Sequence, residues 1–275
     1  MMSARPLDGK VALVSGAARG IGRAIALELA ELGAGVVVTA RTVEPRGDDL
    51  TGTVRETAAE IERIGSKALA VGADLSRQDD RERVVAELLG TFGRVDILVN
   101  NAADTGHNVF RGFWDTTVEE WAAQIDLNLN AMYALMKACA PSMRDNGGGL
   151  IVNLGSMRDI PEGLNGGGGR ISGDVRLGPA YPTSKVAIFA MSTLVAQELS
   201  EDGIVVLTMN PGGAGTESFF HNARRFGWDP SMATPVAMPA KTVGYLATCP
   251  DPMAYAATYV DAVAFAQEKG LVPRL

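Results

Sequence analysis

The sequence predicts a single-domain α/β protein, built on a doubly wound parallel sheet with helices on both faces. Short runs of β-branched and other apolar residues alternate along the chain with longer stretches in which apolar residues recur at helical spacing, as in residues 21–32. The short runs show no strict polar–apolar alternation, which is typical of strands buried on both faces of a sheet. No linker or internal repeat divides the sequence, so residues 1–275 are expected to form one unit.

The elements follow one another in a regular order. Strands are predicted at residues 11–14, 36–38, 68–71, 95–99, 149–154, 204–209 and 255–260. Helices are predicted at about residues 20–32, 54–64, 81–92, 119–144, 181–199, and from the last strand through Lys269. Three stretches interrupt this order: a long loop at 42–53, a glycine-rich insert at about 157–180, and an irregular region at about 212–239.

Composition narrows the function classes. A net charge of −7 disfavours nucleic-acid binding. No apolar run approaches the roughly 18 residues of a membrane span, and the first residues lack a signal peptide. Cys139 and Cys249 lie far apart, and His107 and His221 have no carboxylate-rich surroundings, so neither a disulfide nor a metal site is expected. A cytoplasmic location, with no membrane partner, is the expectation.

A glycine-rich turn, G-x-x-x-G-x-G, joins the first strand to the first helix at residues 16–22. A pyrophosphate needs close approach of the backbone, which a Cβ would block, and amide N–H groups at a helix N-terminus. Gly16, Gly20 and Gly22 provide the first, and the helix beginning near Gly20 provides the second. The turn therefore predicts a dinucleotide site; the alternative is a plain glycine-rich turn.

The end of the second strand favours NADP(H) over NAD(H). An acidic residue there binds the ribose 2′-hydroxyl of NAD. This strand ends with Ala40 and Arg41 and has no carboxylate. The planar guanidinium of Arg41 suits a 2′-phosphate, and Arg19 adds positive charge. The alternative is that both arginines are simply solvated.

Tyr181 and Lys185 lie four residues apart at the start of a predicted helix, so they share one face. A phenol with an ordinary pKa of about 10 needs to fall by about 3 units to exchange protons near neutrality. An ammonium at about 4 Å supplies roughly that stabilisation at an effective dielectric near 20. The pair is therefore expected to act as an acid/base couple.

Together these motifs, in this order, resemble the short-chain dehydrogenase/reductase family over nearly the whole chain. The matching pieces are residues 15–22, Asp74, Asn100-Asn101-Ala102-Ala103, Asn128, Ser156, Tyr181 with Lys185, Pro211-Gly212 and Thr216. The resemblance implies a Rossmann-like fold and an oxidoreductase in which the nicotinamide carries the hydride.

The resemblance also implies catalytic roles. Tyr181 is expected to protonate the carbonyl oxygen, or to act as the base in the alcohol direction, and Ser156 to hold that oxygen. Lys185 is expected to lower the pKa of the tyrosine and to bind the nicotinamide ribose. Asn128 is expected to position a water in a proton relay; the alternative is a buried asparagine inside a helix. The implied cofactor contacts are Gly16, Arg19, Gly20, Ile21, Gly22, Arg41, Asp74, Leu75, Asn101, Ala102, Tyr181, Lys185, Pro211, Gly212 and Thr216.

The chain departs from the family pattern at three places. Ser15 and Ala103 stand where a threonine and a glycine are usual, and the segment between Ser156 and Tyr181 is about twice the usual length. Because glycine raises the cost of ordering a loop, this insert is expected to be mobile. Both of its ends are catalytic candidates, so it is expected at the rim of the site as a lid over the substrate; the alternative is an inert bulge. A second alignment places Ser172 in the role of Ser156.

The substrate is expected to be a hydrophobic ketone or secondary alcohol. Aromatic and apolar residues gather in the region expected to cover it, namely Phe219, Phe220, Phe226, Trp228 and Met232, with Phe110, Phe113 and Trp114 as further candidates. The alternative is that these side chains only pack the loops. The function expected is an NADP(H)-dependent carbonyl reductase or alcohol dehydrogenase. The rival functions are a cofactor-binding regulator and a lyase or epimerase on the same scaffold.

A homotetramer or homodimer is expected from the family resemblance. The predicted helices at 119–144 and 181–199 are the candidates for subunit packing, because Met132, Leu135 and Met136 are taken to add apolar surface there.

Overall fold

A computed structural model of the chain describes residues 5–45, 47, 50–156, 170–172, 175–176 and 178–273. Within these ranges, only the backbone is described at residues 107–108, 170–172 and 175–176.

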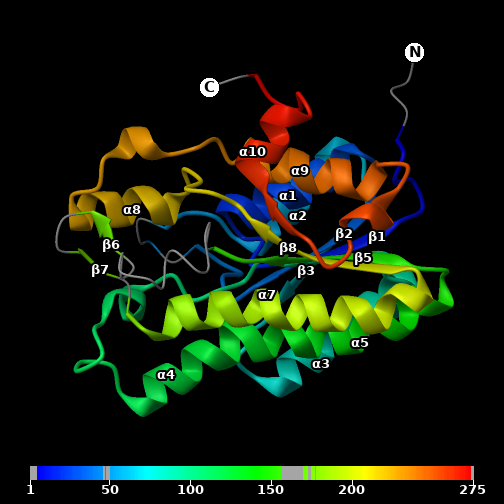
Figure 1. The fold of residues 1–275 in the computed structure, drawn as a ribbon. Coiled ribbons are helices and arrows are strands. Elements are labelled where there is room, and N and C mark those ends of the chain that lie inside the picture. The colour runs from blue at the N-terminus through cyan, green and yellow to red at the C-terminus, as the bar shows by residue number, and fades with distance from the viewer. Residues whose placement is uncertain are drawn as a thin grey trace.

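Seven parallel strands form the central sheet, in the order β3-β2-β1-β4-β5-β8-β9 (Figure 1). Their bounds are β1 Val11–Ser15, β2 Gly35–Ala40, β3 Ala68–Gly72, β4 Ile97–Asn100, β5 Gly149–Leu154, β8 Ile204–Asn210 and β9 Tyr259–Asp261; a small antiparallel pair is formed by β6 Arg170–Ser172 and β7 Val175–Arg176. The strand order reverses between β1 and β4. In such sheets a ligand cleft opens at this point, beside the carboxyl ends of the strands.

Helices cover both faces of the sheet, which confirms the predicted fold class. Helices α1, α2 and α9 lie on one face, and α3, α5 and α7 on the other (Figure 1). The helices are α1 Gly20–Glu31, α2 Val54–Ile64, α3 Gln78–Phe92, α4 Val118–Ile125, α5 Ala131–Asp145, α7 Ala180–Leu199, α8 Glu217–Phe226, α9 Ala237–Thr248 and α10 Ala262–Glu268. Short 3-10 turns occupy His107–Phe110, Ser200–Asp202, Pro230–Met232 and Pro252–Tyr255.

The predicted helix at 119–144 is interrupted. A π-helical segment at Asp126–Asn130 separates α4 from α5 and buries Asn128. Such segments insert one extra residue into a turn and are frequent at functional sites. The apolar periodicity on either side predicts the helix but carries no sign of the interruption.

The region expected to be irregular, 212–239, contains a helix. Helix α8 begins after Thr216, whose side chain accepts a hydrogen bond from the Phe219 amide, and ends at Gly227, where φ is 68°. The irregular assignment is therefore wrong for residues 217–226, which form an amphipathic helix.

The residues expected to provide an apolar surface for subunit packing are part of the core. Met132, Leu135 and Met136 are only 1–2% exposed, and Leu135 and Met136 belong to the core cluster on the face of the sheet that α5 covers. That expectation is therefore wrong for these three residues. On the same two helices, Tyr133 is 51% exposed and Leu194 is 63% exposed. Within the described residues, none of the helices is both long enough and apolar enough to cross a membrane.

Candidate active site

A cavity of ≈ 880 Å³ lies at the carboxyl ends of the central strands. Its wall is contributed by the turn after β1, the ends of β2 to β5 and β8, the first turn of α7, and α8. The cavity is therefore located at the reversal of strand order, where the topology favours a ligand site.

The glycine turn is fitted closely to the residues that follow β4. A Cβ on Gly16 would lie 2.7 Å from Asn101 Nδ2, and a Cβ on Gly22 would lie 2.5 Å from the same atom. Asn101 Nδ2 donates to the carbonyl oxygens of Ser15 (2.8 Å) and Gly16 (3.1 Å). The Ser15 hydroxyl accepts from the amides of Asn101 and Ala102, both at 3.0 Å. The side chain of Asn101 thus holds the turn in shape.

The backbone of this turn fits a pyrophosphate. Gly16, Gly20 and Ile21 line the cavity at the start of α1, where free amide N–H groups and the helix dipole favour an anion. Gly22 lies beneath the turn and does not appear among the described lining residues. The cradle, which side chains would fill, is the observation that supports a dinucleotide at this end.

Both arginines expected at the adenosine end line the cavity, but their surroundings differ. Arg19 donates to the Leu50 carbonyl and, at 3.0 Å, to the Thr42 hydroxyl, so its guanidinium is anchored to the loop after β2. Arg41 is exposed on the rim. Asp74 also lines the cavity, and its carboxylate accepts from the amide (3.1 Å) and hydroxyl (2.8 Å) of Ser76; Leu75 beside it is buried.

Tyr181 and Ser156 face the same cavity from different elements. Tyr181 lies in the first turn of α7, and Ser156 follows β5. Loss of solvation raises the pKa of Tyr181, and a hydrogen bond with the Ser156 side chain offsets only part of that rise. The net direction is opposite to the fall in pKa expected from Lys185. The reason is that burial disfavours a phenolate more than these neighbours stabilise it.

Lys185 lies behind the cavity wall. Its Nζ donates to the Leu154 carbonyl oxygen at 2.9 Å and lies 5.5 Å from the centre of the Tyr181 ring. The residue is 4% exposed, and burial lowers the pKa of its amine to about 8. It remains mostly protonated at neutral pH, one helical turn from the phenol.

Asn128 connects the loop after β4 to α7. Its Oδ1 accepts from the Asp104 amide at 2.8 Å, and its Nδ2 donates to the Ser184 hydroxyl at 3.1 Å. Ser184 in turn donates to the Tyr181 carbonyl oxygen at 2.7 Å. Asn128 is fully buried and lies outside the described lining, so its role in positioning a water stays a prediction.

At the opposite wall, Pro211, Gly212 and Thr216 line the cavity as expected from the resemblance. The Gly212 amide donates to Asn210 Oδ1 at 3.2 Å. Thr216 caps α8 and packs on the glycine turn, because a Cβ on Gly20 would lie 3.0 Å from Thr216 Cγ2. The start of α8 is therefore fixed beside the pyrophosphate cradle.

The aromatic residues divide into two groups. Phe110, Phe219 and Trp228 line the cavity, and Phe226 packs against the Phe110 ring with centroids 4.4 Å apart. The other aromatic and apolar candidates, which are exposed and lie outside the described lining, are Phe113, Trp114, Phe220 and Met232. The expectation of a largely apolar wall is thus met only in part.

Polar residues of α8 also line the cavity, and the sequence reasoning missed them. They are Ser218, His221, Asn222 and Arg225. Their spacing of i, i+3, i+4 and i+7 is the signal that would have found them, once the stretch is recognised as a helix.

Two expectations fall on residues 157–180, most of which lie outside the described part of the chain. The predicted lid is one of them. The other is the alternative role of Ser172, for which only the backbone, in β6, is described. In the part that is described, no group of three or more His, Cys, Asp or Glu residues is arranged to hold a metal ion.

The comparisons with known proteins agree with this geometry. The family model described as short chain dehydrogenase matches residues 10–224. The chain is 30% identical to a 3-oxoacyl-[acyl-carrier-protein] reductase of Synechocystis sp., over 97% of this chain and 98% of the relative. It is similar to a short-chain type dehydrogenase/reductase from Mycobacterium marinum, with a TM-score of 0.78, 28% identity, and coverage of 93% and 94% of the two chains.

A third similar protein is a metagenomic short-chain oxidoreductase solved in complex with NADP. Its TM-score is 0.71 at 32% identity, and the match covers 93% of this chain and 98% of the other. The fold, the cradle at the start of α1 and the sequence matches converge. The chain belongs to the short-chain dehydrogenase family of oxidoreductases, which use a nicotinamide cofactor.

Proposed function

We propose that this protein is an NADP(H)-dependent oxidoreductase that transfers hydride between the nicotinamide and a ketone or secondary alcohol. The observation that carries the proposal is the joint placement of Tyr181 and Ser156 on one cavity, which continues to the glycine turn, with Lys185 one helical turn behind the phenol. In this proposal the proton donor and the hydride carrier share one cavity.

The residues of the chain supply the proton chemistry. Ser156 and Tyr181 both line the cavity, which supports a role for Ser156 as hydrogen-bond donor to a carbonyl oxygen and for the Tyr181 hydroxyl as proton donor to that oxygen. Because its pKa is raised, the phenol is protonated at neutral pH, which suits an acid in the reductive direction. The Lys185 ammonium then stabilises the phenolate that is left. When bound, the nicotinamide supplies or accepts the hydride.

The preference for NADP(H) is supported by the charge at the adenosine end. Arg41 and Arg19 both line this end, and no carboxylate stands at the end of β2. Arg41 is exposed and keeps its guanidinium at the rim, where a 2′-phosphate is held in NADP-binding folds of this kind. The similar protein solved with NADP is consistent with this choice.

We also propose that the enzyme acts in the cytoplasm as a homodimer or homotetramer. The family resemblance supports the assembly, and the exposed Tyr133 and Leu194 on α5 and α7 provide apolar surface for it. Size-exclusion chromatography with light scattering at micromolar concentration tests this, and a monomer would contradict it.

The test of the reaction is a panel of ketones and alcohols with NADPH or NADP, followed by absorbance of the reduced nicotinamide. Tyr181→Phe is expected to lower kcat by about 10²- to 10⁴-fold, because it removes the proton donor and keeps the ring. NADPH affinity, measured by fluorescence, should change little. Tyr133→Phe, on the surface of α5, is the matched control and should be fully active.

The rival functions give different results in the same assay. Tight NADPH binding with no oxidation across the whole panel would indicate a cofactor-binding regulator. Turnover of a substrate without net oxidation of NADPH would indicate a lyase or epimerase. Survival of full activity in Tyr181→Phe would refute the proposed proton donor.

A further inference from the structure

Helix α8 crosses the cavity from the pyrophosphate cradle to the substrate end. Its first residues follow Thr216, which packs on Gly20. Its last residue, Phe226, packs on Phe110. The loop that carries Phe110 is joined to the entry of the catalytic helix, because the Gly178 amide donates to the Val109 carbonyl at 2.7 Å. The last turn of α8 is therefore on the Tyr181 side of the cavity.

Helix α8 turns a polar face toward the cavity. An amphipathic surface helix normally turns its polar face to bulk water. In α8 the apolar stripe Phe219, Ala223 and Phe226 packs with Phe110 and Trp228, while the polar residues at 218, 221, 222 and 225 line the cavity. The substrate end thus combines an aromatic wall with a row of groups that form hydrogen bonds.

Arg225 brings a positive charge to this end. Among the described residues its guanidinium contacts the Phe226 ring, at 5.2 Å from the centroid, and forms no ion pair. Trp228 Nε1, on a lining residue whose ring stacks on Phe226, is buried and has no hydrogen-bond partner in the described part of the chain. The guanidinium and the indole N–H can only donate hydrogen bonds, so both can take an acceptor atom.

The carboxylates of the cavity do not supply that acceptor. Asp74, Asp104 and Asp261 each accept hydrogen bonds from backbone amides of their own turns. Glu217 lies at the opposite end of α8, eight residues before Arg225, which is about 12 Å along a helix. Among the described residues, Arg225 is paired with none of these carboxylates, so its guanidinium is available to a ligand.

We propose that the preferred substrate is a ketone that also carries an anionic oxygen group, a carboxylate or a similar oxyanion, and that Arg225 binds this group. The ketone part of this inference rests on the proposed function; the anion site does not. A guanidinium binds a carboxylate with two parallel hydrogen bonds, and the aromatic wall accepts the apolar body between the two ends. This assignment changes the expected substrate from purely hydrophobic to amphipathic.

The binding test needs no turnover. Cyclohexylalkanoic acids with one to six methylene groups, and their primary amides, are titrated by calorimetry into the wild-type protein and into Arg225→Met, Arg225→Lys and Arg224→Met. At its best chain length the acid is expected to bind the wild type about tenfold more tightly than the amide. Arg225→Met should abolish this preference, and Arg225→Lys should keep part of it. Arg224, the exposed neighbour outside the described lining, should be dispensable.

The acid preference should also weaken as salt is raised, because Arg225 is exposed to solvent. Equal binding of acid and amide by the wild type, no binding of either, or an acid preference that survives Arg225→Met would each overturn the inference. Unchanged melting temperatures of the variants ensure that the loss is local.

The corresponding 4-oxocyclohexyl acids and amides, assayed with NADPH, separate this inference from the reaction itself. A higher kcat/KM for the acid than for the amide in the wild type, but not in Arg225→Met, supports both the reductase activity and the anion site. Acid binding through Arg225 without oxidation of NADPH by any ketone would keep the anion site and refute the reductase. Reduction of acid and amide with equal kcat/KM would keep the reductase and refute the anion site.

Discussion

At the scale of single residues, burial sets the charge states of Tyr181 and Lys185, the proposed catalytic pair. It raises the pKa of the Tyr181 phenol and lowers the pKa of the Lys185 amine to about 8. The two shifts favour the neutral form of each group, as expected when water is removed. Lys185 retains its charge near neutrality with the help of the Leu154 carbonyl, to which its Nζ donates at 2.9 Å.

Lys185→Met is expected to stabilise the protein at pH 7 and to inactivate it. A lysine whose pKa falls from 10.5 to about 8 on folding costs stability below pH 8, and this cost disappears between about pH 8 and 10.5. Removing the amine should therefore raise the free energy of unfolding at pH 7 by about 2 kcal/mol, less than the full linkage because the Leu154 carbonyl loses its donor. Urea unfolding at pH 7 and at pH 10 measures this difference. A stability gain over wild type that is absent at pH 7, or that is as large at pH 10 as at pH 7, would contradict it.

Arg41→Asp is expected to reverse cofactor preference. The carboxylate repels a 2′-phosphate and accepts a hydrogen bond from a free ribose hydroxyl. The ratio of kcat/KM for NADPH to that for NADH should fall by about 100-fold or more, equivalent to about 3 kcal/mol. Arg63→Asp, at an exposed position near the end of α2, is the control. An unchanged ratio in Arg41→Asp would refute the assignment of Arg41.

At the scale of elements, the site depends on two irregularities placed beside regular helices. The π-helical segment at Asp126–Asn130 turns Asn128 toward the loop after β4 and toward α7, so that one buried side chain joins three elements. The glycine turn before α1 brings the backbone within reach of Asn101. Both are positions where a regular helix or an ordinary side chain would not fit.

Two glycine substitutions distinguish a steric clash at the glycine turn from the general effect of replacing glycine by alanine in a helix. Gly22→Ala is expected to weaken NADPH binding at least tenfold, because its Cβ would lie 2.5 Å from Asn101 Nδ2 and from the Gly16 carbonyl oxygen. Gly90→Ala, inside α3, meets nothing within 4 Å and should stabilise the protein by about 0.5–1 kcal/mol through helix propensity. Fluorescence titration and thermal unfolding read out the two effects. Normal NADPH affinity in Gly22→Ala would show that the turn has room to adjust.

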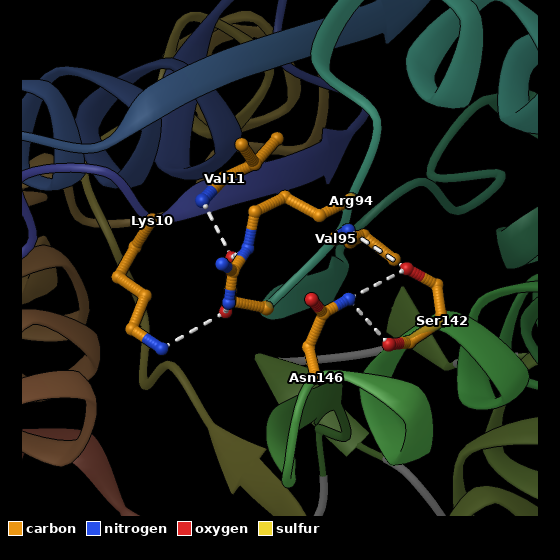
Figure 2. Close-up of polar contacts among 7 residues, drawn as sticks. Lys10, Val11, Arg94, Val95, Ser142 and Asn146 are labelled. Carbon is orange, nitrogen blue, oxygen red and sulfur yellow. Dashed lines mark hydrogen bonds and ion pairs between the residues drawn. The ribbon is translucent and has the colours of Figure 1, made fainter.

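At the scale of the whole molecule, the candidate site lies at the carboxyl ends of the strands, and a cluster of polar contacts around Asp96 lies at their amino ends. Asp96 precedes β4 and is 5% exposed. Its carboxylate accepts from Lys10 Nζ (3.0 Å), the Val11 amide (3.0 Å) and Arg94 Nε (2.9 Å). Figure 2 shows the donor residues Lys10, Val11 and Arg94, with Ser142 and Asn146 of the α5 end nearby. The cluster ties the start of β1 to β4 at the amino edge, away from the cavity.

Asp96→Asn is expected to reduce stability without changing the site. Burial raises the pKa of this carboxyl, but hydrogen bonds from Arg94, Val11 and Lys10 outweigh it and the net pKa is lowered. Its stabilising contribution is therefore present above the unfolded pKa of about 4 and is lost as the pH falls below that value. At pH 7 the variant should lose about 3 kcal/mol, with kcat of the folded enzyme unchanged. Urea unfolding from pH 7 to pH 3 tests this; an equally steep acid dependence in wild type and variant would contradict it.

Local patterns in the sequence predicted most of the architecture. Helix α2 and strand β5 have the predicted bounds, because apolar spacing and end signals such as Thr53 and Gly65 are local properties. The motif residues Gly16, Tyr181 and Ser156 meet at one cavity because parallel strands bring their carboxyl ends to the same edge. Connectivity of this kind can be inferred from the order of strands and helices alone.

Only the tertiary structure decided what surrounds each side chain. Burial reversed the expected shift of the Tyr181 pKa and placed Met132, Leu135 and Met136 in the core. Phe226 packs against Phe110 and Arg225 lines the cavity, in a stretch that the sequence predicts to be irregular. Solvation and the direction of a helix face depend on residues far away in the sequence, so a local pattern determines which elements form but not what each of them faces.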